Sequence, residues 1–348
     1  NIKKIPVHTL ILCRHGDSIW NGGQPGTPET FTGWTDVPLS QKGLMEAKNT
    51  GRELSSYYMH GIDALFTSTL TRAVQTAHNC MWAYSDKPFA SHPQKFVSDY
   101  RLNERHYGAL QGFVKADVES GKYGHNAALV KKWRRGWYEI PPLLDDEDPR
   151  RKEEVRLYAD LCGGADNVPR GESLEIVANN RIRPFLNEVL TPIMNDAASR
   201  RSSKAINDDV TGNYAVGGTG LVVAHANSLR ALIGVMCNVE SNNLALKRLE
   251  TIKIQTGVPL VLKYCQLADG SYKAYDFSPQ LVSEDKMNGS VDIITQPSPD
   301  LPVWPLSCIP KISNKSISQS LRKESPFKVP KNKNPSEQKM PVIQKDII

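Results

Sequence analysis

Two short apolar runs each end in a histidine, and this pairing constrains the fold more than any other feature of the chain. Residues 7–12 contain four large apolar side chains and lead into Arg14 and His15, and residues 221–224 lead in the same way into His225. Apolar runs of this length are typical of buried parallel strands. Ligands of open α/β sheets bind at the carboxyl ends of the strands, where we therefore expect both histidines.

The surroundings of the two histidines favour an anion site. A single histidine at the end of a strand is more often a structural residue that makes a hydrogen bond. Here Arg14 stands beside one histidine, and residues 229–233 after the other have a helical pattern. Guanidinium groups and the free amides at helix N-termini both bind phosphate. The residues themselves therefore favour a phosphate ligand.

The rest of the chain alternates strand and helix signals. Ser40 is a plausible cap for a helix over residues 41–55, residues 62–66 resemble a strand, a helix follows from Leu70, and another is expected over 176–190. This alternation predicts an α/β fold with a mostly parallel central sheet and helices on both of its faces.

Three segments interrupt the pattern. Residues 22–28 have turn composition, and we favour a tolerated surface insertion over an altered rim of the site. Residues 196–220 are rich in Ser, Asn, Asp and Gly and are predicted to form a mobile loop. The acidic run at 145–148 is interpreted as a solvated face or lid, since acids in an unbroken row rarely converge on one metal ion.

The net charge of +6 comes entirely from the end of the chain. Residues 311–348 hold nine Lys or Arg and three acidic residues, so the remaining body is near neutral. A near-neutral body argues against a nucleic-acid-binding surface. We expect a catalytic domain over residues 1–285 and a low-complexity, disordered basic tail over 286–348, for which a solvated role is favoured over a tether.

The six cysteines contain no Cys-x-x-Cys pair, and no apolar run approaches the roughly 20 residues needed to cross a membrane. Neither a zinc site nor a disulfide-rich scaffold is indicated. We expect a cytoplasmic location, with an organelle after removal of a targeting segment as the alternative.

Several motifs occur in the order found in a known family. The chain resembles the cofactor-dependent (2,3-bisphosphoglycerate-dependent) phosphoglycerate mutases of the histidine phosphatase superfamily. The matching segments cover most of residues 7–280 and are residues 14–21, 31–36, 67–73, 102–112, 132–136, 225–230 and 256–260. The segment around Glu104 separates mutases from plainer phosphatases.

The resemblance implies a phosphoryl transfer through the enzyme. His15 is the expected nucleophile, Glu104 the expected acid and base, and Arg14, Arg72 and His225 the expected donors to the phosphoryl oxygens. Further side chains and amides are expected to hold the rest of the substrate: Ser18, Asn21, Thr32, Gly33, Arg105, His106, Tyr107, Lys115, Arg134, Arg135, Ala226 and Asn227.

The implied reaction interconverts 3-phosphoglycerate and 2-phosphoglycerate, primed by 2,3-bisphosphoglycerate and without a metal. The implied partners are these small molecules and further copies of the chain in a dimer or tetramer, with no nucleic acid and no membrane. A phosphatase or a bisphosphoglycerate synthase on the same fold is the alternative, and a non-enzymatic interaction module ranks last.

Two residues depart from the family pattern. Asp17 replaces the usual Glu or Gln, and Ala226 replaces the usual Gly after the second histidine. If the backbone at Ala226 needs a positive φ, alanine would cost on the order of 1 kcal/mol. We expect activity to survive both changes.

Overall fold

The structure is a computed structural model, and it describes residues 5–23, 25–58, 61–85, 93–202, 214–275 and 303–305. The described residues all belong to one compact unit of the chain, Asn1–Lys311. Most of the predicted tail at 286–348 lies outside the described residues.

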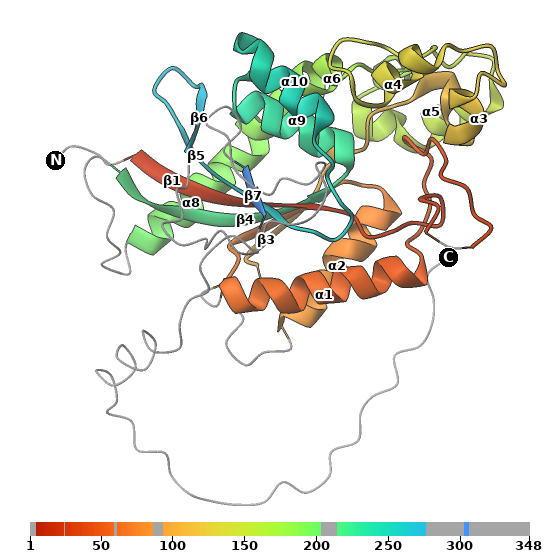
Figure 1. Cartoon of the computed structure of the whole chain (residues 1–348). Coiled ribbons are helices and arrows are strands. Elements are labelled where there is room, and N and C mark those ends of the chain that lie inside the picture. The colour runs from red at the N-terminus through yellow and green to blue at the C-terminus, as the bar shows by residue number, and fades with distance from the viewer. Residues whose placement is uncertain are drawn as a thin grey trace, which may run out of the picture. The chain divides into compact units, whose positions relative to one another are not determined.

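One sheet runs through the centre of this unit (Figure 1). Its strand order is β3-β2-β4-β1-β5-β6, with β7 also paired to β5. The first four strands of this order are parallel to one another, whereas β5 is antiparallel to β1, β6 and β7. The strands are β1 (Ile5–Arg14), β2 (Ala64–Thr67), β3 (Lys95–Ser98), β4 (Tyr214–Ala224), β5 (Leu260–Gln266), β6 (Tyr272–Tyr275) and β7 (Val303–Pro305).

Successive residues of the central strands face opposite sides of the sheet, as the two-residue period of a strand requires. Leu10 and Leu12 of β1 belong to one apolar cluster, and Ile11 and Cys13 belong to another. Because both faces are apolar, both must be covered by helices.

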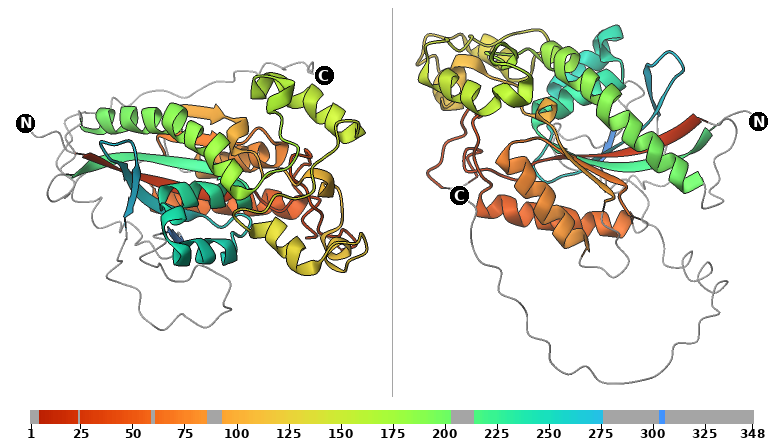
Figure 2. Two further views of the ribbon diagram at one scale, coloured as in Figure 1. Left: turned by 90° about the horizontal axis from the view of Figure 1, so that it is seen from above. Right: turned by 180° about the vertical axis from the view of Figure 1, so that it is seen from behind.

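Helices α1 (Gln41–Tyr57) and α2 (Thr71–Ser85) cover one face, and Figures 1 and 2 show them side by side there. Ser40 caps α1 as predicted, since its Oγ accepts a hydrogen bond from the amide of Gly43 at 3.1 Å.

The other face is covered by a helical run over residues 174–202 and by α9 and α10. The run joins α-helical and π-helical stretches without a break. These elements are α6 (Leu174–Ile176), η4 (Val177–Ile182), α7 (Arg183–Phe185), η5 (Leu186–Leu190), α8 (Thr191–Ser202), α9 (Ala226–Met236) and α10 (Asn243–Thr251). The predicted α/β fold with helices on both faces is therefore confirmed.

Short elements with apolar clusters of their own gather near the carboxyl ends of β1 and β4 (Figure 1). Asp148, from the acidic run, caps the helix that begins at Pro149, because its carboxylate accepts a hydrogen bond from the Arg150 amide at 2.9 Å. The elements are η1 (Tyr100–Leu102), η2 (Gly108–Leu110), α3 (Lys115–Glu119), α4 (Ala127–Arg135), α5 (Pro149–Cys162), η3 (Ala165–Asn167) and, nearer α10, η6 (Val239–Ser241).

One prediction about the chain needs correction. The loop expected over 196–220 is helical up to Ser202 and is a β-strand from Tyr214, and residues 203–213 between them lie outside the described part. Residues 303–305, which fall within the range expected to be a tail, form β7 and pair with β5 in the sheet. The polar, glycine-rich composition of the expected loop misled because β4 pairs with β1 along most of its length and with β2 at residues 220–223, and this pairing overrides local propensity.

Candidate active site

The two predicted histidines lie side by side at the edge of the sheet. Arg14 is in register with Ala224 on the neighbouring parallel strand, and the His15 amide donates to the Ala224 carbonyl at 2.9 Å. The two strands therefore end together, and the rings of His15 and His225 are 4.9 Å apart. The geometry predicted from the two apolar runs is confirmed.

His15 is held as a neutral imidazole with one nitrogen available. Its side chain is almost fully buried, and Nδ1 lies 2.7 Å from the Gly16 carbonyl oxygen, so Nδ1 carries the proton and donates it. Burial, with Arg72 and Arg14 close by, lowers the pKa of His15 well below its usual value. Nε2 therefore keeps its lone pair, as a nucleophile requires.

His225 is also buried, and its Nε2 lies 2.8 Å from the Ser68 hydroxyl oxygen. Its Nδ1 is buried and has no hydrogen-bond partner among the described residues. Burial and the nearby Arg72 lower the pKa of His225 well below its usual value.

Arg72 supplies a buried cation beside the histidines. Its two terminal nitrogens donate to the carbonyls of Gly33 at 2.8 Å and Thr35 at 3.0 Å, which fixes the plane of the guanidinium. Burial lowers the pKa of Arg72 to about 10, so it remains charged at neutral pH.

Glu104 lies on the irregular segment between η1 and η2. One carboxylate oxygen, Oε1, accepts hydrogen bonds from the amides of Arg105 at 2.8 Å and Asn227 at 3.2 Å. The Asn227 amide belongs to the first turn of α9, so the helix that follows His225 also orients Glu104.

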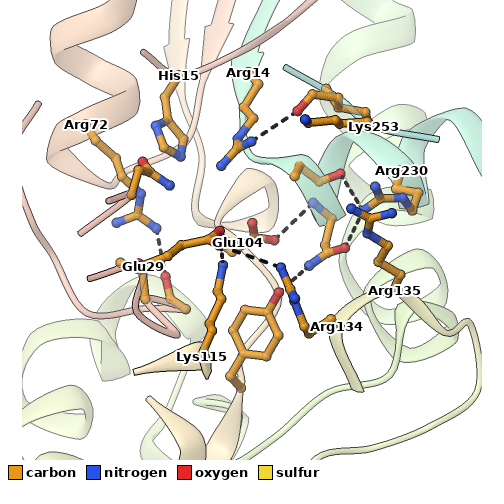
Figure 3. Close-up of a pocket in the computed structure, with 17 residues that line it drawn as sticks. Arg14, His15, Glu29, Arg72, Glu104, Lys115, Arg134, Arg135, Arg230 and Lys253 are labelled. Atoms are coloured by element: carbon orange, nitrogen blue, oxygen red, sulfur yellow. Dashed lines mark hydrogen bonds and ion pairs between the residues drawn. The ribbon is translucent and has the colours of Figure 1, made fainter. Parts of the chain in front are cut away.

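His15, Arg72 and Glu104 line a cavity of about 300 Å³, and Figure 3 shows their side chains around it. This volume is at the lower end of the range for small-molecule sites. Seven lining side chains are cationic and two are carboxylates, so the cavity favours a small ligand with several negative charges. The lining residues are Arg14, His15, Asn21, Glu29, Thr32, Gly33, Arg72, Glu104, Tyr107, Lys115, Arg134, Arg135, Ala226, Asn227, Arg230, Lys253 and Ile254.

The outer part of the cavity is made of ion pairs. Lys115 Nζ lies 2.7 Å from Glu29 Oε1, and Arg134 pairs with Glu119 and lies 3.8 Å from Glu29. Burial lowers the pKa of Lys115, an effect that the neighbouring Glu29 opposes. The side chains of Glu29 and Arg134 remain 45% and 26% exposed, so this wall is in contact with solvent.

Another wall of the cavity is formed by residues of α9. Asn227 Nδ2 donates to the Tyr107 hydroxyl at 2.7 Å, and Asn227 Oδ1 accepts from Arg230 at 2.6 Å. Arg230 also donates to the Ile252 carbonyl at 2.6 Å, which ties α9 to the segment that contains Lys253 and Ile254.

Comparisons with known proteins show the family of the chain. Residues 10–148 match the model of the histidine phosphatase superfamily (branch 1). A 2,3-bisphosphoglycerate-dependent phosphoglycerate mutase of Leifsonia xyli is 38% identical over 290 residues, which cover 83% of this chain and 97% of the relative. The chain belongs to this mutase family. A relative of the same name from Neisseria meningitidis is 37% identical over 254 residues, covering 73% of this chain and 93% of the relative.

A solved structure of mycobacterial glucosyl-3-phosphoglycerate phosphatase is similar to this mutase-family chain with a TM-score of 0.47 and 20% identity. The match covers 74% of this chain and 91% of that structure.

Most of the residues that the family resemblance singled out line the cavity, but four do not. Ser18 lies behind Asn21, with its hydroxyl 2.7 Å from Asn21 Oδ1, and His225 lies behind His15. Arg105 is buried, and its guanidinium donates to the carbonyls of Gly136, Glu139 and Glu172.

His106 is the fourth residue outside the lining. It is buried, with Nε2 2.9 Å from Glu154 and Nδ1 accepting from the Gly108 amide. Arg105 and His106 therefore hold the loop around Glu104, and the expectation that they contact substrate does not fit their positions.

The two departures from the family pattern fit the structure. Ala226 is the first residue of α9, and Asn238 is the sole described non-glycine residue with a positive φ, so alanine carries no strain there. The Asp17 carboxylate accepts from Ser40 Oγ at 2.6 Å and so supports the capped end of α1. A Cβ on Gly43 would lie 1.9 Å from the Asp17 carbonyl oxygen, so the backbone leaves no room for a side chain at position 43.

Four lining residues were missed: Glu29, Arg230, Lys253 and Ile254. Arg230 could have been found, because it follows Ala226 by four residues and shares its helix face. Glu29 directly follows the segment at 22–28 that was interpreted as a surface insertion, and Lys253 carries no local signal. The described residues contain no group of three or more His, Cys, Asp or Glu that could hold a metal, and no described helix is long and apolar enough to cross a membrane.

Proposed function

We propose that this protein interconverts 3-phosphoglycerate and 2-phosphoglycerate through a phosphohistidine at His15, primed by 2,3-bisphosphoglycerate. The observation that carries the proposal is a buried, neutral His15 at the wall of a small cavity with seven cationic side chains. The names of the mutase relatives support the same substrate and cofactor.

The charges of the cavity fit a bisphosphorylated acid. Arg14, Arg72 and the first turn of α9 would hold the phosphoryl group next to His15, and Lys115, Arg134 and Arg135 would hold the second phosphate and the carboxylate. When bound, 2,3-bisphosphoglycerate supplies the phosphoryl group that primes His15.

The transfer itself needs one nucleophile and one proton donor. His15 Nε2 forms a bond to phosphorus while the bond from phosphorus to the departing oxygen breaks, and Glu104 gives that oxygen a proton. In the return step Glu104 takes the proton of a substrate hydroxyl, whose oxygen attacks phosphorus and regenerates neutral His15. Arg14 and Arg72 neutralise the charge on the phosphoryl oxygens in both steps.

The test is an enolase-coupled assay of 3-phosphoglycerate conversion with and without added 2,3-bisphosphoglycerate. We expect stimulated turnover that His15→Ala lowers by about 10⁴-fold or more. His78→Ala, an exposed histidine on α2, is the matched control and should retain full activity.

Release of inorganic phosphate that depends on His15, without isomerisation, would contradict the proposal and identify a phosphatase. Net formation of 2,3-bisphosphoglycerate would identify a synthase. The dimer or tetramer stays a prediction from the family resemblance, and the cytoplasmic location stays a prediction from the sequence.

A further inference from the structure

The loop that carries Glu104 has no regular secondary structure to fix it. Glu104 lies between η1, which ends at Leu102, and η2, which begins at Gly108. Its side chain is nevertheless only 9% exposed, and it lies against the cavity. A group that exchanges protons with a bound substrate must be held within a fraction of an ångström, so other contacts must supply the rigidity.

One arginine binds the backbone on both sides of the Glu104 side chain. Arg181 Nη1 donates to the Asn103 carbonyl at 2.8 Å, and Arg181 Nη2 donates to the Glu104 carbonyl at 3.2 Å. Arg181 lies in the π-helical stretch η4, and such stretches are frequent at functional sites. Its side chain is 5% exposed, so these contacts are shielded from water.

Arg181 is itself fixed by one carboxylate. Its Nε and Nη2 donate to the two oxygens of Glu172 at 2.9 and 2.7 Å, which is a bidentate pair. Glu172 Oε2 also accepts from the His106 amide at 2.8 Å, and the Glu172 carbonyl accepts from Arg105 Nε at 2.7 Å. The pair therefore binds the carbonyls of Asn103 and Glu104 through Arg181. Through Glu172 it binds the His106 amide and the Arg105 side chain, which follow Glu104.

We propose that Arg181 and Glu172 are a positioning pair that sets the Glu104 carboxylate for proton transfer. A buried ion pair is a weak source of folding stability, because desolvation of the two charges offsets their attraction. Its geometry, however, is specific, and here it fixes the two peptide units on either side of Glu104. The inference rests on the proposed role of Glu104 in the mutase reaction.

The first test changes the geometry of the pair and keeps its charge. Arg181→Lys retains the cation but cannot bind both Glu172 oxygens and two carbonyls at once. We expect kcat to fall about 10- to 100-fold, because a displacement of about 1 Å at a reacting group has effects of this size, with KM within about twofold. A purely structural role would lower the thermal midpoint and leave the kcat of the folded fraction unchanged, and this result would overturn the inference.

The second test is a double-mutant cycle with Glu104→Gln. If the pair acts through the Glu104 carboxylate, Arg181→Lys should reduce kcat much less in the Glu104→Gln background than in the wild type. Equal fold-losses in both backgrounds would overturn the inference. Glu104→Gln alone tests the proposed function, because a loss of less than about tenfold would remove Glu104 from the chemistry whatever Arg181 does.

The matched control is Arg183→Lys on the same helical run. Arg183 pairs with Glu240 at 2.9 Å, but the two side chains are 41% and 29% exposed and Arg183 does not line the cavity. Its kcat and KM should equal those of the wild type. Glu172→Gln, which keeps the side-chain shape and one acceptor oxygen, provides the same kcat comparison should Arg181→Lys not fold. An unchanged kcat in that variant would overturn the inference as well.

Discussion

The deep wall and the outer rim of the cavity use similar residue types under opposite physical conditions. The deep wall consists of His15, Arg72 and Glu104, with His225 packed directly behind His15, and the exposed fractions of these four residues are 4, 1, 9 and 0%. Their hydrogen bonds go largely to backbone groups, as in the contacts of Arg72 with two carbonyls. A side chain bound in this way has one position before the ligand arrives.

The outer rim consists of Glu29, Lys115, Arg134, Arg135 and Lys253. Two of its cations contact carboxylates on other side chains, since Lys115 contacts Glu29 and Arg134 contacts Glu119. The Glu29 side chain is 45% exposed, and ion pairs that solvent reaches in this way contribute little free energy, because solvent screens them and their side chains can move.

The difference indicates a division of labour. Prearranged charge in a dry region stabilises the transition state without further reorganisation. Mobile, solvated charge attracts and orients the anion but binds ground state and transition state about equally, which changes KM rather than kcat. Substitutions in the deep wall should therefore lower kcat, and substitutions in the rim should raise KM.

Arg72→Lys should show the largest effect of this kind. Lysine keeps the positive charge but cannot hold the Gly33 and Thr35 carbonyls and face a phosphoryl group at the same time. We expect kcat to fall by about 10²- to 10³-fold, the range found for the loss of one prearranged donor. Steady-state kinetics with a measured thermal midpoint provide the check, and a loss confined to KM would contradict the division of labour.

Lys253→Met should have a much smaller effect. Lys253 lines the cavity from the rim and is exposed, so its charge acts through solvent. We expect KM for 3-phosphoglycerate to rise about threefold with kcat unchanged, and the difference from wild type to shrink at high salt. Lys247→Met, an exposed lysine of α10 outside the cavity, is the control. A fall in kcat would place Lys253 with the deep wall instead.

The histidines at the deep wall could be predicted from the sequence because they follow strand ends, whereas Arg72 and Glu104 were expected from the family resemblance. His15 and His225 end apolar runs, and a parallel sheet brings such ends to one edge. The helices with clear caps or apolar periodicity, such as α1 after Ser40, were predicted for the same local reason. The strands β5 and β7 were not, because β5 pairs with β1 and β7 pairs with β5 across long stretches of sequence. The strand β6, which pairs with β5 across a short turn, was missed as well.

The rim was predicted less completely because tertiary contacts place it. Lys253 reaches the cavity because Arg14 pairs with Thr256 in an isolated bridge and donates to the Ile254 carbonyl at 3.1 Å. No pattern around residue 253 reveals that contact. Arg105 shows the opposite error, since it stands in a family motif and yet its guanidinium is used on backbone carbonyls.

The smallest expected effect is the response of His15 to mild acid. Burial, with Arg72 and Arg14 nearby, lowers the pKa of His15 in the folded protein below 6.5, so the ring should stay neutral at pH 6. A histidine with the ordinary pKa would be about three-quarters protonated there. Ring chemical shifts of His15 in a pH titration provide the measurement, and a midpoint near 6.5 would contradict the dry deep wall. Because the lowered pKa belongs to the folded state, His15 contributes stability above pH 6.5 that is lost as the pH falls below it.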